Sequence, residues 1–203
     1  MSEVSGTDPD RSCGLRERKK ARTYAAIREH ALRLFREQGY AATTVEQIAE
    51  AAEVSPSTFF RYFPTKEDVV LKDDFDPIAI EKFQALPPDM PSVTALRTAM
   101  RETFEEAPPG YVKQWRELNR LTMSVPELRA RALDEYVRSV TMAAELLAKR
   151  LGRDPGDFEV RVLAGAVVGV GMSVMVMAME DPEADIVALM DAGLAKLEEG
   201  VNI

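Results

Sequence analysis

Two short segments that favour helix, each with its own start signal, follow one another closely in the first third of the chain. The first opens on the Thr-Thr pair at 43–44, where either threonine can cap a helix and an acid or amide follows three residues later, as in a capping box. It ends near Ala52. The second opens on the Ser-Pro pair at 55–56, because serine is a good N-cap and proline is tolerated at the first helical position, and it ends before Pro64. Two short helices joined by such a brief turn predict a helix-turn-helix.

The rest of the chain predicts longer helices. Apolar residues recur at helical spacing from Thr23 to Gln38, and Gly39 is the expected stop. No alternating run or hairpin dipeptide predicts a strand, so we expect an all-α chain. Beyond Pro64 the expected helices cover 66–86 with a bend near Pro77, 92–106, 110–124, 126–151, 155–179 with Asp154 as its cap, and 183–199.

The charge is divided unevenly along the chain. Its net value of −8, taken alone, argues against a nucleic-acid binder. Residues 11–66, however, carry eleven lysine and arginine residues against six acidic ones, a net +5, whereas residues 67–203 carry fifteen against twenty-five, a net −10. A basic block on an acidic body is the asymmetry expected where one end of a protein meets a polyanion. Residues 1–19 are expected to form a flexible basic arm.

The second short helix is the element that would enter the DNA major groove. Phe59 and Phe63 are four residues apart and are expected to pack inward, which leaves Phe60 and Arg61 on the outer face. Phe60 suits a thymine methyl group, and Arg61 suits a bidentate contact to guanine. The alternative is an ordinary three-helix cluster whose aromatic residues are core. The expected DNA-binding residues are Thr44, Ser55, Pro56, Ser57, Thr58, Phe60, Arg61, Tyr62 and Lys66.

The segment TTVEQIAEAAEVSPSTFFRYFPTKEDVV, preceded by ALRLFREQGYAATT, resembles the DNA-binding domain of the tetracycline-repressor (TetR) family of bacterial regulators. The resemblance covers residues 20–80 and implies a helix-turn-helix motif at 44–63 in a three-helix N-terminal domain. A larger helical domain for ligand binding and dimerisation would then cover 81–203. By this resemblance the base-reading positions are Pro56, Ser57 and Phe60, and the phosphate-contact positions are Thr44, Tyr62 and Lys66.

Two positions depart from the family pattern. Glu53 stands where the family usually has a glycine with positive φ, and this placement would cost about 1 kcal/mol. Phe60 stands where the family usually has tyrosine, so a hydroxyl contact is lost.

An apolar run of eighteen residues, 162–179, has Ser173 as its sole polar side chain. It is barely long enough to span a membrane and has no basic anchor at its exit, so we expect a helix buried in the core or in a dimer interface. The family resemblance implies dimerisation through the last two helices, which this run suits. A wholly intramolecular core helix is the alternative.

The resemblance also implies a small-molecule pocket among the middle helices. A weaker likeness of the C-terminal part to a TetR subgroup linked to acyl-coenzyme A ligands implies an apolar effector. The alternative is a body that senses a protein or membrane partner and no small molecule. Methionine and aromatic residues fill irregular apolar spaces, and the expected pocket residues are Phe104, Tyr111, Trp115, Met142, Met172 and Met175.

The sequence predicts no enzyme. The chain has one cysteine, Cys13, and one histidine, His30, and it lacks a nucleophile elbow, a P-loop and an HExxH motif. We therefore expect no catalytic residues, no metal and no cofactor. No secretory signal precedes the first helix, which predicts a cytoplasmic protein. The expected function is a homodimeric transcriptional regulator, a repressor that leaves a pseudo-palindromic operator when an effector binds.

Overall fold

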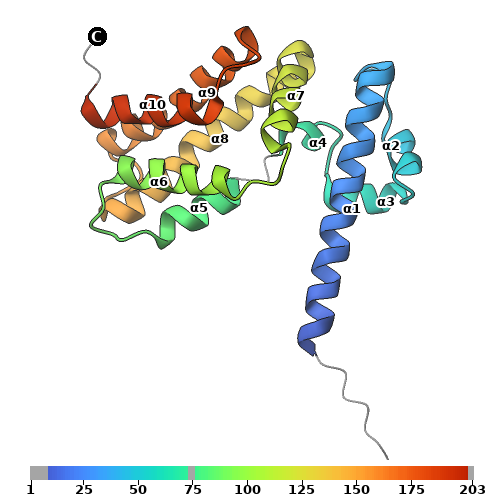
Figure 1. Ribbon diagram of the computed structural model, residues 1–203, viewed down its shortest axis with the longest axis horizontal. Coiled ribbons are helices and arrows are strands. Elements are labelled where there is room, and N and C mark those ends of the chain that lie inside the picture. Colours follow the sequence, from blue (N-terminus) through green and yellow to red (C-terminus); the bar gives the residue numbers. More distant parts are fainter. Residues whose placement is uncertain (1–8, 73–75, 201–203) are drawn as a thin grey trace, which may run out of the picture. The chain divides into compact units, whose positions relative to one another are not determined.

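The computed structural model describes residues 9–72 and 76–200, and every regular element within these ranges is an α-helix (Figure 1). This confirms the all-α expectation. The chain divides into two compact units, the first ending at Lys72 and the second beginning at Asp73.

The first unit contains the two short helices predicted from their caps, together with a long helix before them and a single turn of helix after them. Gly39, with φ of +85°, ends the long helix as predicted. That helix starts earlier than the expected Thr23: residues 9–19, which the sequence analysis assigns to a flexible arm, are helical. Leucine, arginine, lysine, glutamate and alanine, which dominate residues 15–22, are all good helix formers, so the segment extends the helix. The helices are α1 (Pro9–Gln38), α2 (Val45–Ala51), α3 (Pro56–Tyr62) and α4 (Asp68–Leu71).

Aromatic and aliphatic side chains form the core of this unit. Ile27 from α1, Ile48 from α2 and Phe59 from α3 are fully buried. Phe63, which follows α3, is also fully buried and stacks on Tyr24 of α1 with ring centroids 4.5 Å apart. The inward placement of Phe59 and Phe63 confirms their predicted common face.

The second unit is a bundle of six helices within the described residues. The single helix expected over 66–86 is instead α4 and a separate helix in which Pro77 occupies the first turn, where proline is tolerated. The helix expected from Pro155 begins only at Phe158: the carboxylate of Asp154 accepts the Gly156 N–H at 2.7 Å and so caps a turn before the helix. The helices are α5 (Asp76–Ala85), α6 (Ser92–Glu105), α7 (Tyr111–Ser124), α8 (Pro126–Leu151), α9 (Phe158–Glu180) and α10 (Ile186–Glu199).

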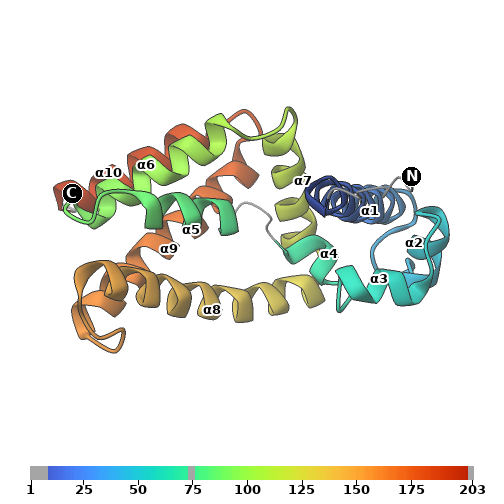
Figure 2. The same ribbon diagram turned by 90° about the horizontal axis from the view of Figure 1, so that it is seen from below.

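Alanines allow the helices of the second unit to approach closely. Ala95 and Ala99 of α6, Ala148 of α8 and Ala164 of α9 are buried in one cluster with Leu147. Helices α6 and α10 also pack against each other, and they lie side by side in both Figure 1 and Figure 2. Small side chains at these contacts let facing helices interdigitate without voids.

The apolar helix α9 is long and hydrophobic enough to cross a membrane by length and composition alone. Here it packs between α8 and α10 and buries one side, with Val160, Ala164, Val174 and Ala178 inward. Only 17% of the most apolar stretch of α9 is fully buried within this chain. Many of its other residues are half-buried, and an apolar side remains exposed in the single chain at Phe158, Val162, Met172, Val176 and Met177.

Candidate nucleic-acid interface

The start of α2 shows which of the two threonines is the cap. The Thr44 hydroxyl accepts the Gln47 backbone N–H at 3.3 Å, and the Gln47 side chain accepts the Thr44 N–H at 2.9 Å, which completes the predicted capping box. Thr43 is buried instead, and its hydroxyl donates to the Gly39 carbonyl at 2.8 Å. Thr44 is thus the exposed member of the pair, at the position assigned to a phosphate contact.

The start of α3 carries a group of hydroxyls. Ser55 is the N-cap, as predicted, and its oxygen accepts the Thr58 N–H at 3.2 Å. The same oxygen lies 2.9 Å from the Ser57 hydroxyl and 3.0 Å from that of Thr58. Ser57 and Pro56 are exposed, whereas Thr58 is half-buried. The hydroxyls are held together near the outer edge of the helix.

The outer face of α3 bears the residues expected there. Phe60 is 49% exposed and meets the buried Phe59 edge to face, with ring centroids 5.5 Å apart. Arg61 is also exposed, and its guanidinium carbon lies 5.3 Å from the centre of the Tyr62 ring. Tyr62 in turn meets Tyr24 of α1 edge to face at 6.5 Å. The Tyr62 ring, itself held by Tyr24, therefore contacts the guanidinium end of the Arg61 side chain.

Lys66 contacts its own unit. Its ammonium donates to the backbone carbonyls of Tyr40 and Thr43, both at 3.0 Å, and stands 4.1 Å from the centre of the Tyr40 ring. The Tyr40 hydroxyl donates to the Glu67 carboxylate at 2.7 Å. Partial burial acts to raise the pKa of Glu67, but the hydrogen bond from Tyr40 and others to the backbone and Thr65 hold that pKa below its usual value. These bonds use two of the three N–H groups of the ammonium, and the phosphate contact expected for Lys66 stays a prediction.

Glu53, in the turn between α2 and α3, has φ of +54°. Its N–H bonds to the Glu50 carbonyl at 3.0 Å, and the Val54 N–H bonds to the Ala49 carbonyl at 2.9 Å. These two bonds form a Schellman motif, whose left-handed position usually belongs to glycine. The expectation drawn from the family pattern, a positive φ at this position, is met by a glutamate.

Three of the six residues expected to line a pocket come together in the second unit. Phe104 and Tyr111 have ring centroids 6.2 Å apart, and Phe104 and Trp115 pack against the buried cluster around Val174 of α9. Met142 and Met172 are each 38% exposed instead, and Met175 is half-buried. The two exposed methionines lie on outer faces of their helices. The sequence did not predict this, because helical spacing alone does not show which side of a mostly apolar helix faces the core.

A groove of about 550 Å³ opens elsewhere in this unit, between α8 and the start of α9. Sequence reasoning missed it, because its wall forms only where the turn before α9 lies against α8. It shares no residue with the expected pocket. Its lining residues are Tyr136, Val137, Val140, Thr141, Ala144, Glu145, Pro155, Gly156 and Arg161.

Comparison with known proteins covers both units. Residues 27–72 match the family described as bacterial regulatory proteins, tetR family, and residues 90–202 match the MftR C-terminal domain. The HTH-type transcriptional regulator TcmR of Streptomyces glaucescens is 34% identical over 166 residues, which cover 78% of this chain and 74% of TcmR.

Two further proteins match nearly the whole chain. A Mycobacterium tuberculosis protein named for the transcriptional regulation of mycofactocin biosynthesis, MftR, is 26% identical over 191 residues, covering 91% of this chain and 94% of its own. The crystal structure of the repressor FadR of Thermus thermophilus in complex with lauroyl-CoA is similar with a TM-score of 0.55 and 26% identity, covering 89% of this chain and 95% of FadR.

Proposed function

The chain belongs to the tetR family of bacterial regulatory proteins and is a DNA-binding regulator of transcription; from that premise we propose that it is a homodimeric repressor released from its operator by an apolar effector. The observation that carries the DNA-binding surface is the outer face of α3, where Phe60 and Arg61 are exposed while Phe59 and Phe63 are buried. A cytoplasmic location follows from the same proposal, since the operator lies there.

In this proposal α3 reads the major groove. Arg61 bonds guanine and Phe60 packs against a thymine methyl group, while Ser57 reaches a base or a phosphate. Thr44 and Tyr62 contact phosphates on either side and fix the register. The exposed basic residues at the start of α1, from Arg16 to Arg22, add attraction to the backbone.

The exposed face of α9 supports dimerisation. Six residues recur along this side of the helix at alternating spacings of four and three, the pattern of helices that pack side by side; four of them are exposed and the two glycines are half-buried. A Cβ atom added to either glycine of this stripe would meet nothing within 4 Å, so a second helix could approach closely. Phe158 and Val162 are 77% and 53% exposed in the single chain. The stripe consists of Phe158, Val162, Gly165, Gly169, Met172 and Val176.

The neighbouring helix α10 widens this surface. Ala188 and Ala192 are exposed one turn apart, and both are small enough for close helix contact. Burial of the α9 stripe and this alanine pair by a second copy would remove from water an apolar area that a soluble protein rarely leaves exposed. We therefore assign the α9–α10 face to the dimer.

The effector is proposed to carry an apolar acyl chain, as does the lauroyl-CoA that is in complex with FadR of Thermus thermophilus. The supporting feature is the aromatic cluster of Phe104, Tyr111 and Trp115 beside α9. Arg116 of α7 donates from its guanidinium to the carbonyls of Asp181 and Ala184 and so holds the turn between α9 and α10.

The first test is selection of genomic DNA fragments by the full-length protein, followed by electrophoretic shift at several salt concentrations. Binding that weakens steeply with salt is expected, and no salt-sensitive binding to any fragment would refute the proposal. Native mass spectrometry of the purified protein tests the effector. A co-purifying acyl compound that releases the selected DNA supports the proposed effector. Release only by a protein or by lipid vesicles would instead favour a C-terminal domain that senses a protein or membrane partner.

A further inference from the structure

Tyr24 of α1 contacts the end of α3, the helix proposed to read the major groove. Its ring stacks on that of Phe63, with centroids 4.5 Å apart and planes inclined by 27°. The same ring meets Tyr62 edge to face, with centroids 6.5 Å apart and planes inclined by 60°. Both spacings lie in the range in which aromatic rings attract one another. One side chain of α1 therefore holds two successive residues at the C-terminal end of α3.

The two residues that Tyr24 contacts differ in exposure. Phe63 is fully buried and belongs to the core, whereas Tyr62 is half-buried. A half-buried tyrosine packs its apolar ring against the protein and keeps a polar tip at the surface. The Tyr62 ring also meets the Arg61 guanidinium, whose carbon lies 5.3 Å from the ring centre. These ring contacts restrict the rotamers of Tyr62 and so the place of its hydroxyl.

The Tyr24 ring is itself held in place. The Lys72 ammonium stands 5.0 Å from the centre of this ring. The backbone of Lys72 is tied to α1 as well, because its carbonyl accepts a hydrogen bond of 2.6 Å from the Arg28 guanidinium, one turn along α1 from Tyr24. Tyr24 thus has contacts with α3 and with the end of α4, and its ring forms a fixed support for Tyr62.

We propose that Tyr24 is a positioning residue for DNA binding: its ring holds Tyr62 in the orientation in which the Tyr62 hydroxyl meets a phosphate. This inference rests on the proposed function, in which Tyr62 makes such a contact. A side chain that is ordered before binding loses less conformational entropy when the contact forms. Loss of the Tyr24 ring should therefore weaken DNA binding through Tyr62.

The test uses the full-length protein and a genomic fragment selected as described above, at one fixed salt concentration. Tyr24→Leu removes the ring, Tyr24→Phe keeps the ring without its hydroxyl, and Tyr62→Phe removes the hydroxyl that is proposed to meet the phosphate. Tyr24→Leu and Tyr62→Phe are combined in a double-mutant cycle on affinity. The thermal midpoint of each variant shows that it is folded at the temperature of the binding measurement.

The matched control is Phe35→Leu, which also removes a ring from α1. Phe35 is buried, and its ring pairs with that of Tyr40 at 5.0 Å, in the loop after α1. This substitution should lower the thermal midpoint, because it leaves a space in the core. Its effect on affinity should be the same with Tyr62 and with Tyr62→Phe, since the ring pair of Phe35 lies away from the end of α3.

Tyr62→Phe should bind about tenfold more weakly than the wild-type protein, as expected for one hydrogen bond to a charged group. Tyr24→Leu should bind about fivefold more weakly, which corresponds to the ordering of one side chain. The double variant should bind no more weakly than Tyr62→Phe, because no contact is left for Tyr24 to position. Tyr24→Phe should restore most of the affinity that leucine loses.

Three results would overturn the proposal. Additive losses for Tyr24→Leu and Tyr62→Phe would mean that Tyr24 only stabilises the fold. A loss for Tyr24→Phe as large as that for Tyr24→Leu would mean that the Tyr24 hydroxyl acts directly. Binding by Tyr62→Phe at the wild-type level would mean that there is no hydroxyl contact to position.

If Tyr24→Leu does not fold, Tyr24→Met replaces it in the same cycle, since methionine fills irregular apolar space but has no ring. The same additive and non-additive outcomes then decide. Failure of the wild-type protein to bind any fragment is a different result, because it refutes the proposed function itself.

Discussion

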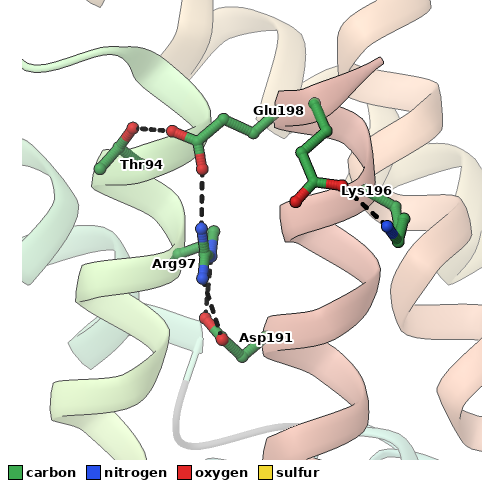
Figure 3. A network of polar contacts seen from close by, with 6 residues as sticks. Thr94, Arg97, Asp191, Lys196 and Glu198 are labelled. Atoms are coloured by element: carbon green, nitrogen blue, oxygen red, sulfur yellow. Dashed lines mark hydrogen bonds and ion pairs between the residues drawn. The ribbon is translucent and has the colours of Figure 1, made fainter. Parts of the chain in front are cut away.

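The guanidinium of Arg97 on α6 and the carboxylate of Asp191 on α10 form two parallel hydrogen bonds, of 2.9 Å from Nε and 3.0 Å from Nη2 (Figure 3). The remaining Nη1 donates at 2.7 Å to the carboxylate of Glu198, which lies further along α10 near its C-terminal end. Thr94 donates to the other oxygen of Glu198. Arg97 therefore holds α6 to the last helix of the chain at two points.

This cluster predicts a pH dependence of stability. The hydrogen bond from Arg97 lowers the pKa of Asp191 below its usual 3.8, and bonds from Thr94 and Arg97 lower that of Glu198 below its usual 4.5. Carboxylates with lowered folded pKa values contribute their full stability above about pH 4.5 and lose it as the pH falls through those values. Arg97→Met should lower the thermal midpoint by a few degrees at pH 7, and this difference should shrink below pH 4.

The matched control is Arg101→Met on the same helix, because Arg101 meets Glu105 only at 3.9 Å with both side chains largely exposed. Such a pair contributes little, so its removal should leave the thermal midpoint nearly unchanged at every pH. A loss for Arg97→Met that persists undiminished in acid would contradict the assignment to the carboxylates.

Glu53→Gly is expected to stabilise the protein. A non-glycine residue at φ of +54° costs about 1 kcal/mol, and glycine removes that cost at a small entropic penalty. We expect a net gain of about 0.5 kcal/mol in the free energy of unfolding by urea denaturation. Glu50→Gly, an exposed position inside α2, should instead lose about 1 kcal/mol. Equal losses at both sites would mean that the turn tolerates glutamate without strain.

Gly193 permits the close approach of α10 to α9. A Cβ atom at this position would lie 2.5 Å from the Val170 side chain, too close for any real contact. Gly193→Ala should therefore destabilise the second unit by about 1–3 kcal/mol. At Gly14 of α1 a Cβ atom meets nothing within 4 Å, so Gly14→Ala should be neutral or stabilising. Calorimetry on both variants tests the difference, and a neutral Gly193→Ala would show that α10 shifts freely.

Gly169→Leu tests the dimer. A bulky side chain in the middle of the exposed α9 stripe leaves the fold of one chain intact but holds a second helix away. Analytical ultracentrifugation should show a dimer for the wild-type protein and a weakened dimer for the variant. Met142→Glu, at an exposed position on α8 outside the stripe, serves as the control and should stay dimeric. A dimer that survives Gly169→Leu would place the interface elsewhere.

Arg61→Ala is expected to relax base preference at one operator position, at a cost of about 1–3 kcal/mol against the preferred base. Lys20→Ala, an exposed charge on α1, should weaken binding to every sequence alike. Binding measured on an operator with single-base changes distinguishes the two. Uniform losses across all operator variants for Arg61→Ala would show that Arg61 reads no base.

Local chemistry explains which features could be predicted. The caps at Thr44 and Ser55 and the inward face of Phe59 and Phe63 depend on residues a few positions apart, whereas the positive φ at Glu53 was expected only from the family resemblance. The contacts of the Lys66 ammonium with backbone carbonyls could not be predicted in this way, because its partners lie 23 and 26 residues earlier in the chain.

The sequence by itself determined that the chain is helical, where the short helices begin, and which residues of α3 face outward, because capping and helical periodicity act over one or two turns. Tertiary structure alone decided which sides of α9 are covered, where the groove beside α8 lies, and which charges are occupied, such as Lys66, Arg97 and Arg116. Those outcomes depend on packing between distant segments. An apolar helix has no periodic signal to orient it, and a cation bonds whichever acceptors the fold brings within reach.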